Sequence, residues 1–494
     1  MKHYLGVDIG TYETKGVITD GAGRIAAQAA RPHRMLVPQP GWAEHRPEED
    51  WWGDFVHVTQ KMLAESGIAP ASIAAVATSA IGPCMLPVDR DGCPLMNAVL
   101  YGVDTRATAE IAELNALIGA DAILERCRNG LSAQAAGPKI LWLKRQRPDI
   151  YGRTHKVLNS TSFLVHRLTG AFTIDHYSAG NSTPFYLPGK LAWSDELAPG
   201  MIDIGLMPDL KWSTDIAGQV TKPAAEATGL AAGTPVIAGT IDAAAEAVSV
   251  GVTDPGQMMV MYGSTIFIIQ ITAEPIRDSR LWYSPWLFPG QHAAMAGIAT
   301  TGTLTHWFRR VAARDLPPAG AIGILNEEAL ASPPGANGLV LLPYFSGALT
   351  PLFDPSAKGM IFGLDLTHTR GDMFRAALEG VAHATRHIFE TYAGAGHAPR
   401  EVYAVGGGTR SRVWTQATSD TCNTTQMLRE KSWGASFGDA FLAALAVGDV
   451  KPDDIQQWNP VVTEITPDPA TRGTYDAAHK TFRELYTATR QLLP

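Results

Sequence analysis

One aspartate near the middle of the chain follows a short apolar stretch and precedes an alanine-rich helix. Residues 234–238 predict a buried strand that stops at Gly239, and Asp242 opens the helical stretch. A carboxylate held at such a junction can accept a proton from a substrate hydroxyl, so Asp242 is a candidate general base. Aspartate is also a common helix N-cap, and the neighbouring residues alone leave both interpretations open.

Two turns that combine glycine with hydroxyl residues suit phosphate binding. The first follows the predicted strand 4–8, and the second follows the predicted strand 257–262, about 250 residues later. Glycine lets the backbone approach a ligand, and the N–H groups of such a turn can point at an anion. Two facing turns could hold a triphosphate from both sides. The residues of these turns predicted to bind ATP are Gly10, Thr11, Thr14, Lys15, Gly263, Ser264 and Thr265.

A third glycine-rich turn favours a nucleotide. The predicted strand 401–405 runs into three glycines, and a helix follows. This arrangement lets a flat base or ribose approach the backbone, and the N-terminus of the helix favours phosphate. The chain has no GxxxxGK[ST] sequence, which disfavours a P-loop enzyme. The residues predicted to contact the nucleotide here are Gly406, Gly407, Gly408 and Arg410.

Asp8 ends the first predicted strand directly before the first turn. Mg²⁺ keeps most of its waters when bound and needs only one or two carboxylates. We therefore predict that Asp8 and Asp242 hold Mg²⁺, with Asp8 acting through water. The alternative for Asp8 is an exposed residue of an ordinary hairpin.

Residues of the first half of the chain are candidates for contact with a small sugar. Trp42 lies in a polar loop, and an aromatic ring suits the apolar face of a sugar, although the same ring could fill the edge of a core. Asp104 could accept bonds from substrate hydroxyls while Arg106 braces it, or it could cap a helix. Ile81, just after the predicted strand 73–78, completes this predicted pocket.

The elements that must position these residues alternate between strands and helices, which predicts an α/β protein. With 494 residues, the chain is long enough for two domains. A net charge of −8 gives no basic surface for nucleic acid, and no apolar run reaches the ~20 residues that a membrane span needs. The N-terminus lacks a signal-peptide pattern, and the four cysteines form no CxxC pair. We therefore expect a cytoplasmic protein that acts on a small molecule.

Several motifs, in order along nearly the whole chain, resemble those of the FGGY family of carbohydrate kinases, and within it the xylulokinases. The resembling segments are 6–11 (first phosphate motif), 42–44 and 51–52 (N-terminal segment of xylulokinases), 137–142 (first signature), 357–364 with 375–380 (second signature) and 406–411 (adenosine loop).

This resemblance implies two actin-like (ribonuclease H-like) ATPase domains with a deep cleft between them. Residues 1–241 would bind the sugar and carry the first phosphate hairpin, and residues 242–494 would bind ATP. The resemblance also implies Mg²⁺ as a cofactor, Asp242 as the catalytic aspartate and Asp8 as the aspartate linked to the metal. Many members of the family are dimers, so a homodimer is an expectation as well.

The chain departs from the xylulokinase pattern at residues that would contact the sugar. Residues 79–82 read Ser-Ala-Ile-Gly where xylulokinases carry Gln-Met-His-Gly, and Ala243 stands where they carry asparagine. The side chains that would bind sugar hydroxyls are therefore replaced, and the resemblance does not fix D-xylulose as the substrate. Glu13 is a further departure, because a carboxylate beside phosphate is unfavourable unless it points away.

The sequence thus predicts ATP-dependent phosphorylation of a hydroxyl of a small carbohydrate, such as a ketopentose or a related polyol, with Asp242 as the base. One alternative is a kinase for a sugar acid or another small carbohydrate, in which Arg106 would be the cationic partner. A second alternative is a non-catalytic actin-like ATP-binding regulator, which would need no base at Asp242.

Overall fold

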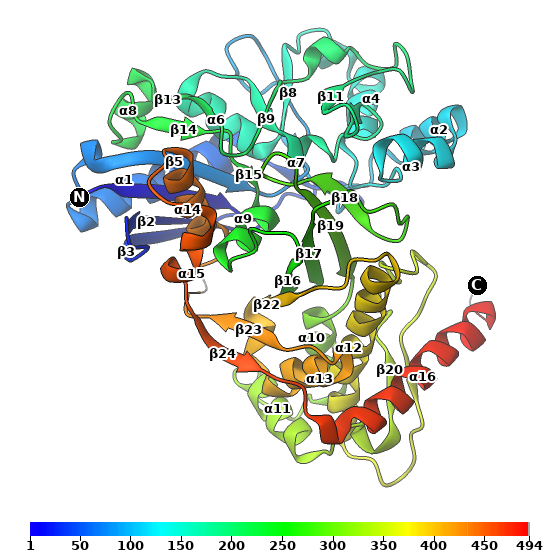
Figure 1. Cartoon of the computed structure of the whole chain (residues 1–494). Helices are drawn as coiled ribbons and strands as arrows, with labels where there is room; N and C mark the ends of the chain where they lie inside the picture. The colour runs from blue at the N-terminus through cyan, green and yellow to red at the C-terminus, as the bar shows by residue number, and fades with distance from the viewer. Residues whose placement is uncertain (432, 493–494) are drawn as a thin grey trace.

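Two mixed β-sheets form the framework of the chain (Figure 1). The computed structural model describes residues 1–431 and 433–492. The first sheet has the order β13-β14-β5-β1-β2-β3, with β15 also paired to β5. Its strands are β1 (His3–Ile9), β2 (Glu13–Asp20), β3 (Ile25–Pro32), β5 (Ile73–Ala80), β13 (Ile216–Gln219), β14 (Pro235–Ile237) and β15 (Thr240–Ile241).

The second sheet is built from the other half of the chain and has the order β18-β19-β17-β16-β22-β23-β24. Its strands are β16 (Gln257–Tyr262), β17 (Ile266–Thr272), β18 (Trp282–Pro285), β19 (His292–Ile298), β22 (Glu401–Val405), β23 (Gln426–Arg429) and β24 (Val461–Ile465).

The two sheets repeat one topology. In the first, β1, β2 and β3 pair antiparallel in succession, and β5 lies parallel to β1 on its other side. In the second, β16, β17 and β19 pair antiparallel, and β22 lies parallel to β16. Each sheet therefore has a hairpin whose turn lies beside the end of a parallel strand, as the two glycine-hydroxyl turns predict. The predicted α/β fold with two actin-like halves is confirmed.

Two helices rich in small residues, α9 (Asp242–Ser249) and α14 (Ala435–Ala446), pack side by side between the sheets (Figure 1). A Cβ at Gly6 of β1 would lie 2.0 Å from the carbonyl oxygen of Ser436, and a Cβ at Gly438 would lie 1.9 Å from that of Ala245. Glycine at both positions lets α14 contact β1 and α9 backbone to backbone.

Apolar residues of both sheets join α9 and α14 in one buried core. Tyr4 and Ala77 come from the first sheet, and Met259 and Ile269 come from the second. The predicted domain boundary between residues 241 and 242 falls at the first residue of α9, inside this shared core, and it stays a prediction.

The remaining helices cover the outer faces of the sheets or form the insertion between β7 and β13. Among the described residues, no helix combines the length and the apolar character that a membrane crossing requires. The remaining helices of the first half are α1 (Asp54–Ser66), α2 (Thr108–Ile118), α3 (Ala120–Cys127), α4 (Ala136–Gln146), α5 (Pro148–Tyr151), α6 (Ser160–Thr169), α7 (His176–Ala179) and α8 (Lys222–Thr228). In the second half they are α10 (Gly302–Ala312), α11 (Ala321–Ala331), α12 (Arg370–Gly394), α13 (Arg412–Cys422), α15 (Ile455–Trp458) and α16 (Arg472–Thr489).

Short strand pairs complete the fold and hold loops at the edges of the two halves. These strands are β4 (Glu44–His45), β6 (Leu86–Val88), β7 (Ala98–Val99), β8 (Lys156–Leu158), β9 (Thr173–Asp175), β10 (Tyr186–Leu187), β11 (Ala192–Trp193), β12 (Asp209–Lys211), β20 (Val340–Leu342) and β21 (Met360–Phe362).

We predict that Gly438→Ala lowers the melting temperature, because the added methyl group would overlap the carbonyl oxygen of Ala245. Overpacking of this kind costs about 1–3 kcal/mol, which is at least ~2 °C for a domain of this size. Gly323→Ala in α11 is the matched control, since nothing lies within 4 Å of a Cβ there. Alanine favours the helix, so the control should melt at or above the wild-type temperature. Equal melting temperatures for the two variants would contradict the packing argument.

Candidate active site

Three neighbouring parallel strands end at one edge of the first sheet and bring distant residues together there. Asp8 of β1 pairs with Ser79 of β5, and Ser79 pairs in turn with Thr240 of β15. Asp242 directly follows β15 and is the first residue of α9, whose N-cap is Ile241. Asp242 is therefore not the N-cap, and its Oδ1 accepts a 2.7 Å bond from the N–H of Ala243.

Four carboxylates face one another at this edge. The charges of Asp242, Asp439 and Glu246 all act on Asp8. Ser79 links two of the acids, because its hydroxyl donates to Asp439 Oδ2 at 2.7 Å and lies 3.3 Å from Asp8 Oδ1. Glu246 stands one helical turn after Asp242 on α9, and Asp439 is on α14. Lys15 is the cation whose charge opposes the acids at Asp8 and at Glu246.

Burial and mutual repulsion raise the pKa values of this acid cluster. Desolvation raises the pKa of Asp242 to about 7. Desolvation, followed by the charge of Asp242, raises the pKa of Glu246 to about 7 as well. The pKa values of Asp8 and Asp439 lie well above their usual range, first because of desolvation and then because of the neighbouring acids. A group of carboxylates with raised pKa values in a cleft marks a functional site.

The acid cluster fits a hydrated cation. Oδ1 of Asp439 is buried and accepts no hydrogen bond among the described residues. In the same part of the chain, no three His, Cys, Asp or Glu side chains are close enough to enclose a bare metal ion. Mg²⁺ that keeps its waters needs only one or two direct carboxylates, so this donor set suits it.

Hydrogen bonds and one ion pair hold the residues of the first phosphate turn in place. The N–H of Gly10 donates to the carbonyl of Glu13 at 2.9 Å, and Thr11 Oγ1 lies 3.1 Å from the hydroxyl of Tyr101. Glu13 is exposed and pairs with Lys15 at 3.4 Å, so its carboxylate need not oppose a phosphate. Thr14 is fully buried and donates to Asp54, so the predicted contact between its hydroxyl and phosphate does not fit this placement.

The second phosphate turn lies beside the glycine loop. β16 ends before Gly263 and runs parallel to β22, which ends before Gly406. Ser264 and Thr265 are exposed in the turn. A Cβ at Gly406 would lie 2.6 Å from the carbonyl oxygen of Tyr262, which explains the glycine. The other residues predicted to bind the nucleotide, Gly407, Gly408 and Arg410, belong to the short helix that follows, and Gly407 and Arg410 are exposed.

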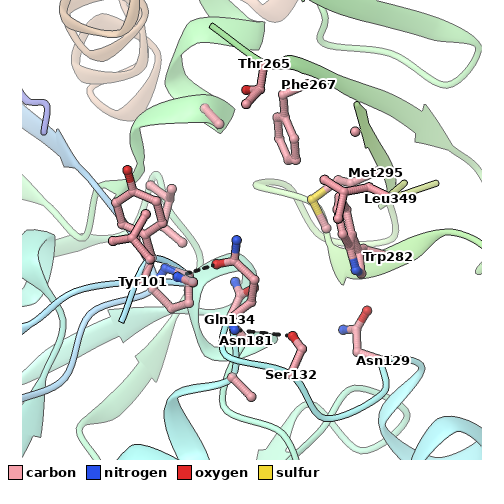
Figure 2. A pocket seen from close by; sticks show the side chains of 18 of the residues that line it. Tyr101, Asn129, Ser132, Gln134, Asn181, Thr265, Phe267, Trp282, Met295 and Leu349 are labelled. Carbon is pink, nitrogen blue, oxygen red and sulfur yellow. Dashed lines mark hydrogen bonds between the residues drawn. The ribbon is translucent and has the colours of Figure 1, made fainter. Parts of the chain in front are cut away.

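A cavity of about 710 Å³ lies between the two halves (Figure 2). Asp242 and Thr265 line it, so the candidate base and the second turn share one cavity. Figure 2 shows polar side chains of the first half facing apolar side chains of the second. The polar set is Tyr101, Asn129, Ser132, Gln134 and Asn181, and the apolar set is Met261, Phe267, Trp282, Met295 and Leu349.

Two amide side chains of the polar set form hydrogen bonds with the backbone of the cavity wall. Asn129 pairs with both backbone groups of Tyr283 on β18, donating to its carbonyl at 2.7 Å and accepting from its N–H at 2.9 Å. This pairing joins the two halves at the rim of the cavity. Gln134 accepts a bond from the N–H of Gly102 at 3.1 Å through Oε1, which leaves its amide N–H groups to a ligand. Among the described residues that line the cavity, Asp242 is the one charged residue.

The predicted sugar-binding residues Trp42, Asp104 and Arg106 are not in the cavity wall. The Arg106 side chain is completely buried, with Nη2 2.7 Å from Asp104 Oδ2 and 2.9 Å from Glu44 Oε1. Its guanidinium lies 3.8 Å above the ring of Trp42. The prediction of substrate contact does not fit this placement, because Glu44 and Trp42 hold the arginine away from the cavity. Ile81 is buried as well and lies next to lining residues rather than among them.

Sequence reasoning assigned no role to Tyr101, Gln134 or Asn181 in the cavity, or to Glu246 and Asp439 in the acid cluster. The spacing of four residues between Asp242 and Glu246 predicts a shared helix face and could have indicated Glu246. Asp439 has no such signal, because its place follows from the contact of α14 with β1.

Models of one family match both halves of the chain. The N-terminal domain of the FGGY family of carbohydrate kinases matches residues 3–249, and its C-terminal domain matches residues 258–447. Xylulose kinase of Bacillus subtilis is 26% identical, over 100% of this chain and 98% of the relative. Glycerol kinase of Chromobacterium violaceum is 29% identical, over 92% of each chain.

Solved structures agree with this match. The crystal structure of xylulose kinase from Rhodospirillum rubrum is 32% identical in sequence, covers 99% of both chains and superposes with a TM-score of 0.93. The superposition extends over nearly the whole chain and therefore includes both sheets. The chain belongs to the FGGY family of carbohydrate kinases.

Proposed function

We propose that this carbohydrate kinase transfers the γ-phosphoryl group of ATP to a hydroxyl of a neutral ketopentose, such as xylulose, or of a related polyol. The observation that carries the proposal is the position of Asp242, which lines the cavity next to both an acid cluster and a phosphate turn. The names of the relatives support a small polyhydroxy acceptor, since they include xylulose kinases and a glycerol kinase.

Asp242 acts as the general base in this proposal. Its carboxylate takes the proton of the acceptor hydroxyl while the hydroxyl oxygen bonds to the γ-phosphorus, and the bond from that phosphorus to the β,γ-bridging oxygen breaks to release ADP. The N–H and hydroxyl groups of Thr11, Ser264 and Thr265 stabilise charge on the transferring group. Closure of the cavity around the acceptor keeps out water, which would otherwise hydrolyse ATP.

The acid cluster would hold Mg²⁺ through Asp8 and Asp242, with Asp439 behind them. When bound, Mg²⁺ neutralises charge on the β- and γ-phosphates. Ser79 keeps Asp439 and Asp8 in place for this role, because its hydroxyl donates to Asp439 and contacts Asp8.

A neutral acceptor is favoured over a sugar acid by the charges of the cavity. Within residues 1–431 and 433–492, the lining includes no lysine or arginine, and Arg106, the predicted partner of an acid, is buried in its own ion pair. A carboxylate beside Asp242 would therefore be repelled without compensation. The regulator alternative is not favoured either, because the relatives that match the whole chain are named as enzymes.

The composition supports a small-molecule enzyme of the cytoplasm that binds no nucleic acid. All four cysteines are free, as a reducing compartment favours, and the net charge is −8. A homodimer remains part of the proposal because it is common in the family.

We predict that Asp242→Asn lowers kcat for phosphoryl transfer by about 10²–10⁴-fold, because the amide cannot accept the hydroxyl proton. Binding of ADP without Mg²⁺ should change little, since the glycine loop and both turns stay intact. ADP release with a panel of ketopentoses, pentitols, tetritols and glycerol measures the first effect, and calorimetry measures the second. Turnover equal to that of the wild type would contradict the role of Asp242.

The activity should also depend on pH through Asp242, whose pKa burial raises to about 7. Below that pH the carboxylate is protonated and cannot act as a base, so kcat/KM for the acceptor should fall about tenfold per pH unit. Above it, kcat/KM should be level. Raising the Mg²⁺ concentration should move the acidic limb to lower pH, because a cation stabilises the ionised carboxylate. A level profile from about pH 5 to about pH 9 would exclude Asp242 as the titrating base.

The neutral cavity should make the enzyme prefer a ketopentose or pentitol over the corresponding sugar acid by at least about 10²-fold in kcat/KM. Asn181→Lys adds a cation to the cavity wall and should narrow this preference. Asn181→Leu is the matched control, because it removes the same amide without adding charge. If the acid is the better substrate of the wild type, the assignment of a neutral acceptor is wrong.

A further inference from the structure

Two buried histidines lie behind the first phosphate turn and bind its backbone. We infer that His33 and His45 are positioning residues that hold the carbonyl groups of this turn, and thereby set the affinity of the enzyme for the terminal phosphate of ATP. The inference rests on the proposed function, since it takes the turn as the binding site for that phosphate.

His45 binds the turn in one defined tautomer. Its side chain is completely buried, and the indole N–H of Trp51 donates to Nδ1 at 3.0 Å. Because Nδ1 is an acceptor, the ring proton is on Nε2, which donates to the carbonyl of Thr11 at 3.1 Å. Desolvation and the nearby His33 lower the pKa of His45 to about 4, which keeps the ring neutral and Nδ1 free to accept.

His33 binds the neighbouring carbonyl and faces an acceptor on each side. Its side chain is 3% exposed, with Nε2 2.9 Å from the carbonyl oxygen of Gly10 and Nδ1 2.8 Å from Oδ2 of Asp54. Because a carbonyl oxygen can only accept, Nε2 donates to Gly10, and Nδ1 faces the carboxylate of Asp54. Arg31 lies 3.1 Å from the other oxygen of Asp54, and Thr14 donates to the same Oδ2 as His33.

These bonds fix the direction of the N–H groups of the turn. The carbonyl of a trans peptide points opposite to the N–H of the next residue, so a carbonyl held on the buried side turns that N–H to the exposed side. His33 holds the carbonyl of Gly10 and thus orients the N–H of Thr11, and His45 holds the carbonyl of Thr11 and thus orients the N–H of Tyr12. The backbone N–H of His33 holds the carbonyl of Tyr12 at 2.9 Å as well.

The two oriented N–H groups are free for a ligand. Across residues 1–431 and 433–492, neither Thr11 nor Tyr12 donates its backbone N–H to a protein acceptor. Tyr12 is 61% exposed, and Thr11 is joined by its hydroxyl to Tyr101 in the cavity wall. Two free N–H groups beside the cavity make an anion site.

The second turn offers an independent comparison. There the carbonyls of Gly263 and Ser264 accept bonds from the N–H groups of Thr301, Gly302 and Thr303 at the start of α10. In both turns the carbonyl groups therefore accept hydrogen bonds on the side away from the ligand. The donors are a helix N-terminus at the second turn and two imidazole rings at the first. Holding the carbonyls is thus a shared property of the two turns and not an accident of filling the core near His33 and His45.

Paired substitutions separate positioning from packing. The amide of glutamine reaches about as far as Nε2 of histidine, whereas the amide of asparagine reaches only as far as Nδ1. His45→Asn keeps an acceptor for Trp51 and loses the bond to Thr11, and His45→Gln keeps the bond to Thr11. His33→Asn and His33→Gln differ in the same way at Gly10. All four variants place a polar side chain in the same polar site, which favours folding, and melting temperatures verify it.

The measurement is the affinity for Mg-ADP and for the magnesium complex of β,γ-imido-ATP, a triphosphate that is not hydrolysed. Each asparagine variant should lose about tenfold in affinity for the triphosphate, as expected for one hydrogen bond of about 1.4 kcal/mol. Its affinity for ADP should change less than about threefold, and each glutamine variant should stay within about threefold of the wild type for both nucleotides.

Three outcomes would overturn the inference: wild-type triphosphate affinity in both asparagine variants, an equal loss for ADP and triphosphate, or the same loss in the glutamine variants. His166→Asn is the matched control, because this buried histidine stacks on Phe172 of the first half with ring centroids 4.2 Å apart and does not touch the turn. It should leave the ratio of the two affinities unchanged. Binding needs no acceptor, so the result is independent of the acceptor chosen, whereas a wild type that binds neither nucleotide would contradict the proposed function itself.

Discussion

The backbone contact of α14 with β1 and α9 is the constraint on which the site depends. Because Gly6 and Gly438 carry no side chain, the helices approach closely enough to place Asp439 and Asp242 beside Asp8. Four acids are buried in this small space, and desolvation, followed by their mutual repulsion, raises their pKa values. The packing of small residues therefore maintains an arrangement of charge that is unfavourable by itself and that a bound cation relieves.

The duplicated sheets supply two turns of similar form, and the two halves support them with different chemistry. A helix N-terminus lies behind the second turn, and a pair of histidines lies behind the first. The cavity between the halves is divided in the same way, with amides on the side of the first half and with aromatic and thioether side chains on the other (Figure 2). We therefore propose that acceptor recognition is concentrated in the first half, and nucleotide binding in the second.

The sequence pattern was enough to predict those elements that depend on residues close together in the chain. The two hairpins, the strand before Asp242 and the glycine loop all appear where turn residues and apolar periodicity place them. The burial of Arg106 could not be predicted in this way. It depends on contacts with Glu44 and Trp42, which are about sixty residues away in the sequence and which only the fold brings close. Asp439 could not be found for the same reason: its neighbour Asp8 stands at the other end of the chain, and only the helix contact joins them.

The pairing of Asn129 with Tyr283 has a consequence for the open form of the enzyme. β18 is an edge strand of the second sheet, and the Asn129 amide satisfies the N–H and the carbonyl of Tyr283 as a neighbouring strand would. A separation of the halves to admit substrate would remove the partner of these two groups and leave the sheet with an unpaired edge. An unpaired edge is a template for strand addition, so the state in which the enzyme exchanges its ligands is also the state most exposed to aggregation.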